Sequence, residues 1–114
     1  MKKMTIHVFE KKKLLSNNAN DYLITTINYD DNKKKIIDFS IIQILFEEKP
    51  IQIIKYDSSH GYCHAHKYYT TNSNPQEISM EINPKTIKEL KEDIQQNWRK
   101  YKEQYQKKQR FNNL

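Results

Sequence analysis

The feature of this sequence that most restricts its fold is a change in the spacing of its apolar residues at Pro84. Before this proline, apolar and β-branched residues alternate with polar ones, as they do in half-buried strands. After it, apolar residues recur three or four positions apart, as they do along one face of a helix. The sequence therefore predicts strands first and one helix last.

Five or six strands are predicted between residue 4 and about residue 82, separated by short segments rich in Asn, Asp, Ser and Pro. Such short connections favour an antiparallel meander, because a parallel crossover needs a dozen or more residues. The predicted strands span residues 4–9, 22–29, 36–46, 51–57, 62–70 and, as the sixth, 77–82.

The helix is predicted to span residues 84 to about 106, followed by a polar tail over 107–114. Asn83 can cap its first N–H groups, and Pro84 fits the first helical position. The predicted fold class is therefore α+β, with a single antiparallel sheet and one long C-terminal helix packed on one face, in one domain of 114 residues. The apolar stripe of the helix comprises Ile87, Leu90, Ile94, Trp98, Tyr101 and Tyr105.

Basic charge gathers at the two ends of the chain, whose formal net charge is +6. Residues 1–13 contain five Lys and one Glu, a net +4, and residues 98–114 contain six basic residues and one Glu, a net +5, so the middle carries −3. Basic ends suit phosphate backbones or an acidic partner. They arise more commonly as solubilising charge.

Several classes of protein are excluded by what the sequence lacks. It contains no apolar stretch of about eighteen residues that would span a membrane as a helix, and its first residues lack the apolar stretch of a signal peptide. Its single cysteine, Cys63, permits neither an internal disulfide nor a cysteine-rich zinc site. We therefore expect a cytoplasmic protein that does not associate with membranes and is stabilised by packing.

Three of the four histidines, His60, His64 and His66, lie within seven residues of one another. The only glycine, Gly61, follows His60 and predicts a turn with positive backbone φ. A four-residue loop over 58–61 would pair Lys55 with His64 across the hairpin. One face would then lie beneath the helix and carry Ile54, Tyr56, Cys63 and Ala65. The other face would carry Lys55, Asp57, Tyr62, His64, His66 and Tyr68.

The same pairing rule applied to the preceding hairpin gives the histidine face an apolar end. Ile44 would pair with Ile53, and Ile42 with Lys55. These side chains would be exposed unless the N-terminal strand region, a second copy of the chain or a protein partner covered them. We therefore expect a cognate partner or a homodimer over Ile42, Ile44, Phe46, Ile51 and Ile53.

Three interpretations of the histidines remain open. In the first, they are half-polar residues on a sheet surface, within a module that binds nucleic acid or protein without catalysis. In the second, His64 and His66 bind a metal ion, because two positions apart is a common spacing of β-strand ligands, and His60 or Asp57 completes the site. The third is RNA cleavage without a metal or other cofactor, and it is the preferred hypothesis.

Cleavage of RNA needs a base, an acid and a cation near the phosphate. Imidazoles titrate near neutral pH, so His64 and His66 are the expected proton-transfer pair, with His60 contacting phosphate or partner. Lys55 would stabilise phosphate charge, and Asp57 lies on the same face. The expected RNA-binding residues are Tyr62 and Tyr68, which can stack on bases, and Arg99 and Lys102 of the helix, which can contact the backbone.

The segment IIKYDSSHGYCHAH at residues 53–66, followed by IKELKEDIQQNWRKY at 87–101, resembles a group of small prokaryotic proteins. These proteins share a Tyr-Asp turn, a His-Gly pair and an H-x-H strand before a terminal helix. The same residues are similar to TumE-like toxins of toxin–antitoxin loci. The resemblance implies a small cytosolic toxin that acts on RNA and is neutralised by a cognate antitoxin. The positions that map onto it are Asp57, His60, Gly61, His64 and His66.

Overall fold

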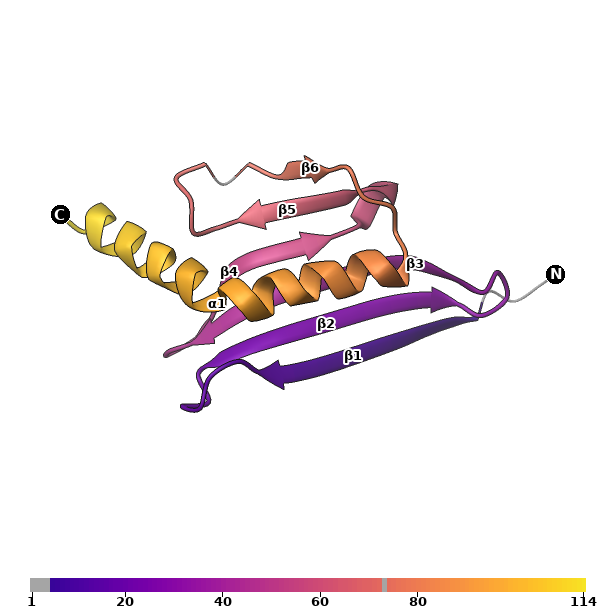
Figure 1. Cartoon of the computed structure of the whole chain (residues 1–114), viewed down its shortest axis with the longest axis horizontal. Coiled ribbons are helices and arrows are strands. Elements are labelled where there is room, and N and C mark those ends of the chain that lie inside the picture. Colours follow the sequence, from indigo (N-terminus) through magenta and orange to yellow (C-terminus); the bar gives the residue numbers. More distant parts are fainter. Residues whose placement is uncertain (1–4, 73) are drawn as a thin grey trace.

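The protein has the α+β architecture that the sequence predicts: one open antiparallel sheet and a single C-terminal helix (Figure 1). The computed structural model describes residues 5–72 and 74–114. Each strand pairs with the next one along the chain, so the order β1-β2-β3-β4-β5-β6 is a meander. The elements are β1 (Ile6–Leu14), β2 (Asp21–Asp30), β3 (Lys35–Phe46), β4 (Pro50–Asp57), the 3-10 turn η1 (Ser59–Gly61), β5 (Cys63–Lys67), β6 (Gln76–Ile78) and α1 (Pro84–Asn112).

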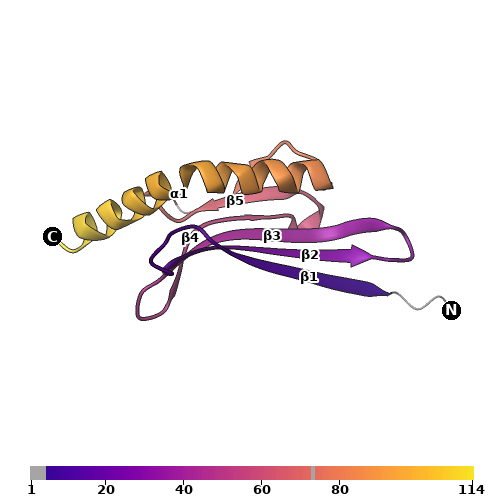
Figure 2. The ribbon, with the colours of Figure 1, turned by 60° about the horizontal axis from the view of Figure 1, so that its bottom comes forward.

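Helix α1 lies across one face of the sheet, and the core is formed between them (Figures 1 and 2). The Asn83 side chain accepts a hydrogen bond from the Thr86 N–H at 2.8 Å, which caps the helix as predicted. Each apolar side chain that is fully buried here contributes about 1.5–3 kcal/mol to folding. The buried core comprises Leu23, Phe39, Ile41, Ile54, Tyr56, Cys63, Ala65, Ile87, Leu90 and Ile94, so the expectation about the hairpin face beneath the helix is confirmed.

Polar contacts also attach the helix to the sheet. Asp93 accepts hydrogen bonds from the hydroxyls of Tyr56 and Tyr101, at 2.6 and 2.9 Å. Farther along the helix, Lys102 Nζ lies 3.2 Å from the buried carboxylate of Asp21 at the start of β2. These contacts fix α1 on the sheet at two positions along its length.

Some predicted boundaries need correction. Helix α1 continues past residue 106 and ends at Asn112. Within this extension, the half-buried side chain of Lys108 donates a hydrogen bond to the carbonyl of Tyr68 at 3.1 Å. Most of the predicted polar tail is therefore helix. Strand β1 extends to Leu14 rather than ending at residue 9, and Met4, its predicted first residue, lies outside the described residues. Strands β5 and β6 end earlier than predicted.

The pairing of β3 with β4 contains a bulge that the sequence analysis missed. The predicted pair Ile42–Lys55 is confirmed, and Ser40 faces Asp57 in the same register. Beyond Gln43 the register shifts by one residue, so Ile44 faces Gln52 instead of Ile53. The shift turns Ile51 toward α1, where it lines a 650 Å³ cavity that helix residues also line.

The expectation of an exposed apolar end is wrong for two of its five residues. Ile53 is 0% exposed and Ile44 is 8% exposed within the single chain. Ile42, Phe46 and Ile51 are half-buried. A partner or homodimer over these residues remains a prediction, but less apolar surface is available to it than expected.

Candidate functional site

The candidate site is built on the hairpin that joins β4 to β5, at the face opposite to α1. Ser58 follows β4 and is 1% exposed. Its hydroxyl accepts a hydrogen bond from the Phe39 N–H at 2.8 Å, and its own N–H donates to the Phe39 carbonyl at 3.1 Å. These two bonds tie the beginning of the turn to β3, so the residues that follow start from a fixed point.

The turn itself contains two successive residues with left-handed backbone. Gly61 has φ +85°, as its position after His60 predicted, and His60 has φ +69°. A histidine in this region bears a steric cost that glycine avoids. In this conformation the exposed side chain of His60 is one of those that line the site.

The hairpin register differs from the prediction by two residues. Asp57 faces His64, and Lys55 faces His66, whereas Lys55 was expected opposite His64. The turn is longer than four residues because η1 and the extended Tyr62 precede the first pair of the ladder. A shift of two residues keeps every side chain on its predicted face, because the side-chain period of a strand is two.

Asp57 is the centre of the site. Its Oδ1 lies 3.1 Å from His64 Nδ1, and its Oδ2 lies 3.4 Å from His66 Nε2 and 3.5 Å from Lys55 Nζ. The carboxylate side chain is 10% exposed. Both imidazoles thus project from the same face of β5, away from the core, as expected. We refer to Lys55, Asp57, His60, His64 and His66 as the histidine cluster.

Contact with Asp57 also sets which nitrogen of each histidine is available. A neutral His64 that donates from Nδ1 to the carboxylate has an unprotonated Nε2. His66 contacts the carboxylate through Nε2, so its Nδ1 is the atom left for another partner. The two ring centroids are 6.4 Å apart.

A hollow of 340 Å³ adjoins the cluster. The Tyr62 ring packs 4.1 Å from the His64 ring, and the Tyr68 ring stacks on His66 at 5.9 Å, so both expected aromatic residues adjoin the histidines. Ser59, His60, Tyr62, His64, His66, Pro75 and Glu77 line the hollow. Aromatic, imidazole and carboxylate groups therefore meet in one place.

Glu77, Ser59 and Pro75 are the lining residues that sequence reasoning missed, and the first two carry polar side chains. Glu77 lies on β6 directly across from His64. No pattern in the sequence could have identified Glu77, because β6 has only three residues and its register with β5 is not written in them. Ser59 gave no signal beyond its position in the turn, and its hydroxyl lies 3.4 Å from Asp57 Oδ1.

The structure does not bring Arg99 and Lys102 to this site. Both lie on α1, which covers the other face of the sheet (Figure 2). Lys102 is paired with Asp21, and the Arg99 guanidinium lies 5.1 Å from the Trp98 ring. Within one chain, the helix and the histidine cluster therefore cannot contact the same few nucleotides.

The histidine cluster is not arranged as a metal centre. Within residues 5–72 and 74–114, no group of three or more His, Cys, Asp and Glu side chains is placed to hold a metal ion. The ammonium of Lys55 beside Asp57 also competes with a cation for this carboxylate. Metal binding therefore gains no support from the geometry.

The fold and site define a two-layer α+β protein with a polar cluster on its open sheet face. The chain belongs to the family described as a domain of unknown function, DUF7718, whose model matches residues 9–111. Comparisons with curated proteins and with solved structures give no significant match. The resemblance to TumE-like toxins stays a prediction. In the part of the chain that the structure describes, no helix has the length and apolar character required to cross a membrane.

Proposed function

We propose that this protein is a toxin-like endoribonuclease of the cytoplasm that cleaves RNA without a metal ion. The observation that carries the proposal is the single buried carboxylate, Asp57, which holds two imidazoles and one ammonium within 3.5 Å at the edge of a hollow. Two histidines fixed on one rigid strand supply the acid and the base that such cleavage requires.

His64 is the proposed base. Its free Nε2 takes the proton from a ribose 2′-OH, whose oxygen attacks the adjacent phosphorus. His66, protonated and held by Asp57, donates a proton to the 5′-oxygen as the P–O bond breaks. The products are a 2′,3′-cyclic phosphate and a 5′-hydroxyl, and the next turnover requires the proton to return from His64 to His66 through solvent.

The charge beside a phosphate depends on the histidines. Lys55 and Asp57 cancel one another and Glu77 adds a negative charge to the hollow, so two of the three histidines must be protonated to give a net charge of +1. The two imidazole rings, whose centroids are 6.4 Å apart, both line the hollow, so one phosphate group there would be near both. His60, at the mouth of the hollow, is placed to contact a second phosphate or a partner.

The aromatic residues supply the contact to a base. Tyr62 is 44% exposed, and its ring lies beside the His64 ring at a centroid distance of 4.1 Å, so part of the ring is open to a base. A base that stacks on such a ring contributes about 1–3 kcal/mol. Tyr68 continues the aromatic surface beyond His66.

A second candidate is binding of RNA without cleavage. His64 is only 8% exposed, and a histidine this buried can serve mainly to fix the hairpin. In this case the exposed His60 and Tyr62 would contact RNA, and Asp57 would have a structural role. The two candidates differ in whether a product forms.

The test is cleavage of a fluorogenic single-stranded RNA in the presence of EDTA. We expect wild-type protein to form a 2′,3′-cyclic phosphate and to leave a substrate with 2′-O-methyl groups intact. His64→Ala and His66→Ala should each lower the rate at least about 100-fold. His7→Ala is the matched control, because His7 is exposed on β1, at the far edge of the sheet, and should change nothing.

Three results would overturn the nuclease proposal. Full activity in both cluster variants would exclude these histidines as the proton-transfer pair. Loss of wild-type activity in EDTA would favour metal chemistry. Salt-dependent RNA binding by the wild type, with no product at any concentration, would support the binding module instead. Circular dichroism of each variant separates loss of activity from loss of fold.

A further inference from the structure

Strand β1 is an open edge of the sheet. It ends the strand order, so its outer backbone N–H and C=O groups have no strand partner among the described residues. All nine of its residues are exposed, and Val8 and Phe9 are 65% and 57% exposed. A long and uncovered edge strand is a template for another strand to pair with.

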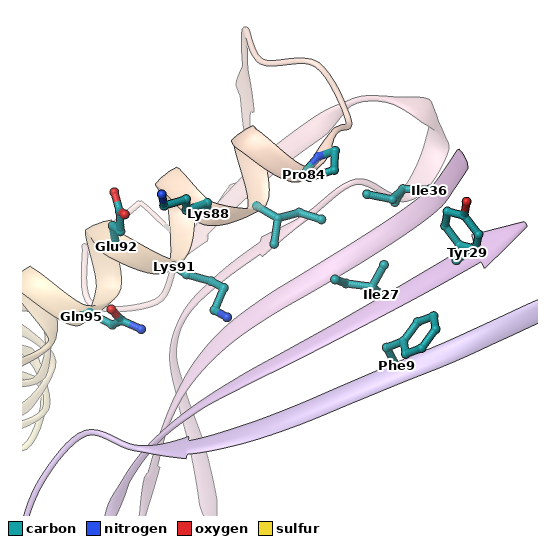
Figure 3. A pocket seen from close by; sticks show the side chains of 10 residues that line it. Phe9, Ile27, Tyr29, Ile36, Pro84, Lys88, Lys91, Glu92 and Gln95 are labelled. Carbon is teal, nitrogen blue, oxygen red and sulfur yellow. The ribbon is translucent and has the colours of Figure 1, made fainter. Parts of the chain in front are cut away.

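A groove lies beside this edge, between β1, the neighbouring strands and α1 (Figure 3). Its volume is 610 Å³. Phe9, Ile27, Ile36 and Ile87 give it an apolar lining, while Lys91 extends from α1 toward the sheet. An extended chain that paired with β1 would place every second side chain on this side of the sheet.

The edge and the groove carry more positive than negative charge. Lys11 and Lys13 follow Phe9 on the same side of β1, and Lys88 and Lys91 come from α1. None of these four forms an ion pair with any residue in the described ranges. Burial, together with the charges of Lys11 and Lys13, lowers the pKa of Lys91. Glu92 is the one acidic residue in the groove lining, so the two lining lysines and the two β1 lysines together leave an excess of positive charge.

We propose that β1 and this groove bind an extended acidic segment of a partner protein, which adds to the sheet as a seventh strand. Its backbone would hydrogen-bond to the free edge of β1. Its side chains on the α1 side would be apolar opposite Phe9 and acidic opposite Lys11 and Lys13. This matches the pattern of strand addition, in which main-chain bonds give affinity and alternate side chains give specificity.

Two other occupants fit less well. A second copy of the chain would bring three more β1 lysines to the same edge, and lysines on edge strands oppose such self-pairing. RNA matches the charge but cannot form a β-ladder with the free backbone. The proposed surface is separate from the histidine cluster, because β1 and β5 lie toward opposite edges of the sheet. It therefore does not depend on the nuclease proposal.

The experiment uses the full chain and a short fluorescent peptide in which one Val and two Glu stand at every second position with Thr between them, so that the Val and both Glu lie on one face of the added strand. We expect saturable binding by fluorescence anisotropy, with slower hydrogen exchange at β1 amides in the complex. The double variant Lys11→Glu/Lys13→Glu should bind at least about tenfold more weakly. It should gain affinity for the matching Val–Lys peptide. The matched control is Lys100→Glu/Lys107→Glu, which changes the net charge equally at exposed helix positions and should bind the Val–Glu peptide like wild type.

Other results would overturn the proposal. An equal loss of affinity for the Val–Glu peptide in both double variants would show that binding follows net charge alone. Equal binding of a peptide with prolines at alternate positions would exclude strand addition, because such a peptide cannot form the ladder. Displacement of the peptide by an RNA oligonucleotide that also protects β1 would assign the edge to nucleic acid. A stable dimer by light scattering, dissociated by the β1 charge reversal, would assign it to a second copy.

Discussion

At the scale of single residues, the turn of the candidate site depends on two left-handed positions. A Cβ at Gly61 would meet no heavy atom within 4 Å beyond its two chain neighbours, so the need for glycine comes from its φ of +85° rather than from lack of space. We predict that Gly61→Ala lowers the free energy of unfolding by about 1–2 kcal/mol. His60→Gly should raise it by up to about 1 kcal/mol while lowering RNA cleavage or binding. Urea unfolding measures both changes, and an unaffected Gly61→Ala would contradict the assigned backbone.

Asp57 is the residue on which the cluster depends most. Asp57→Asn removes the charge that both histidines and Lys55 contact, and its amide cannot accept from all three. We predict a loss of about 2 kcal/mol in the free energy of unfolding and at least about a 100-fold loss in cleavage rate. Asp31→Asn, at an exposed turn, is the control and should leave both unchanged. A fully active Asp57→Asn would remove Asp57 from the site.

The sequence could place the histidines on one face, but it could not place their partners. His64 and His66 are two residues apart, so any regular strand puts them on the same side. Which residue lies opposite His64 depends on the turn, and no local pattern indicates that His60 adopts positive φ. The contribution of Glu77 depends on β6, a three-residue strand with too short a pattern to give a register.

At the scale of elements, the contact between helix and sheet at Asp93 predicts a pH dependence of stability. Burial, and the hydrogen bond to Asp93, raise the pKa of Tyr56 and of Tyr101 above the ordinary value of about 10. The unfolded chain therefore releases these protons more readily than the folded one. The stability from this contact is fully present below about pH 10 and is lost as pH rises above it. Urea unfolding between pH 8 and about pH 11 should show this loss, and Tyr56→Phe/Tyr101→Phe should lessen it.

The contact at the other end of the helix predicts a coupled pair of substitutions. Lys102→Met leaves Asp21, which is 1% exposed, without its partner, and should cost about 3 kcal/mol. Asp21→Asn/Lys102→Met should recover most of this loss, because no buried charge then remains unpaired. Thermal unfolding of the wild type, the two single variants and the double variant measures the coupling. Additive losses would contradict a direct interaction.

The elements themselves were predictable, whereas their registers and ends were only partly so. Period-two and period-3.6 patterns arise from burial of one face, which is written in the sequence near each element. The bulge beyond Gln43 lies beside a tertiary contact that no local pattern reveals. The side chain of Gln43 donates a hydrogen bond to the backbone carbonyl of Trp98 on α1 at 2.9 Å, fifty-five positions away. The extension of α1 likewise depends on its contact with Tyr68, which the polar composition of residues 107–112 does not reveal.

At the scale of the whole molecule, the fold separates three surfaces. The helix covers one face of the sheet, the histidine cluster lies on the other, and β1 forms one edge (Figures 1 and 2). A ligand on the cluster and a strand on β1 can therefore bind together. This separation explains why the basic charge at the two ends of the sequence does not indicate the candidate site. The basic residues near these ends lie on β1 and on α1, whereas the site lies on the hairpin between β4 and β5.

The last turns of α1 extend beyond the ends of the strands (Figures 1 and 2), and the molecule measures 59 × 29 × 23 Å. Its radius of gyration is 15.6 Å. A compact domain of this length would have a radius of about 13 Å. A rod tumbles and migrates more slowly than a sphere of equal mass. We predict that the monomer elutes early in gel filtration, at an apparent mass above 13.9 kDa, while light scattering returns the monomer mass.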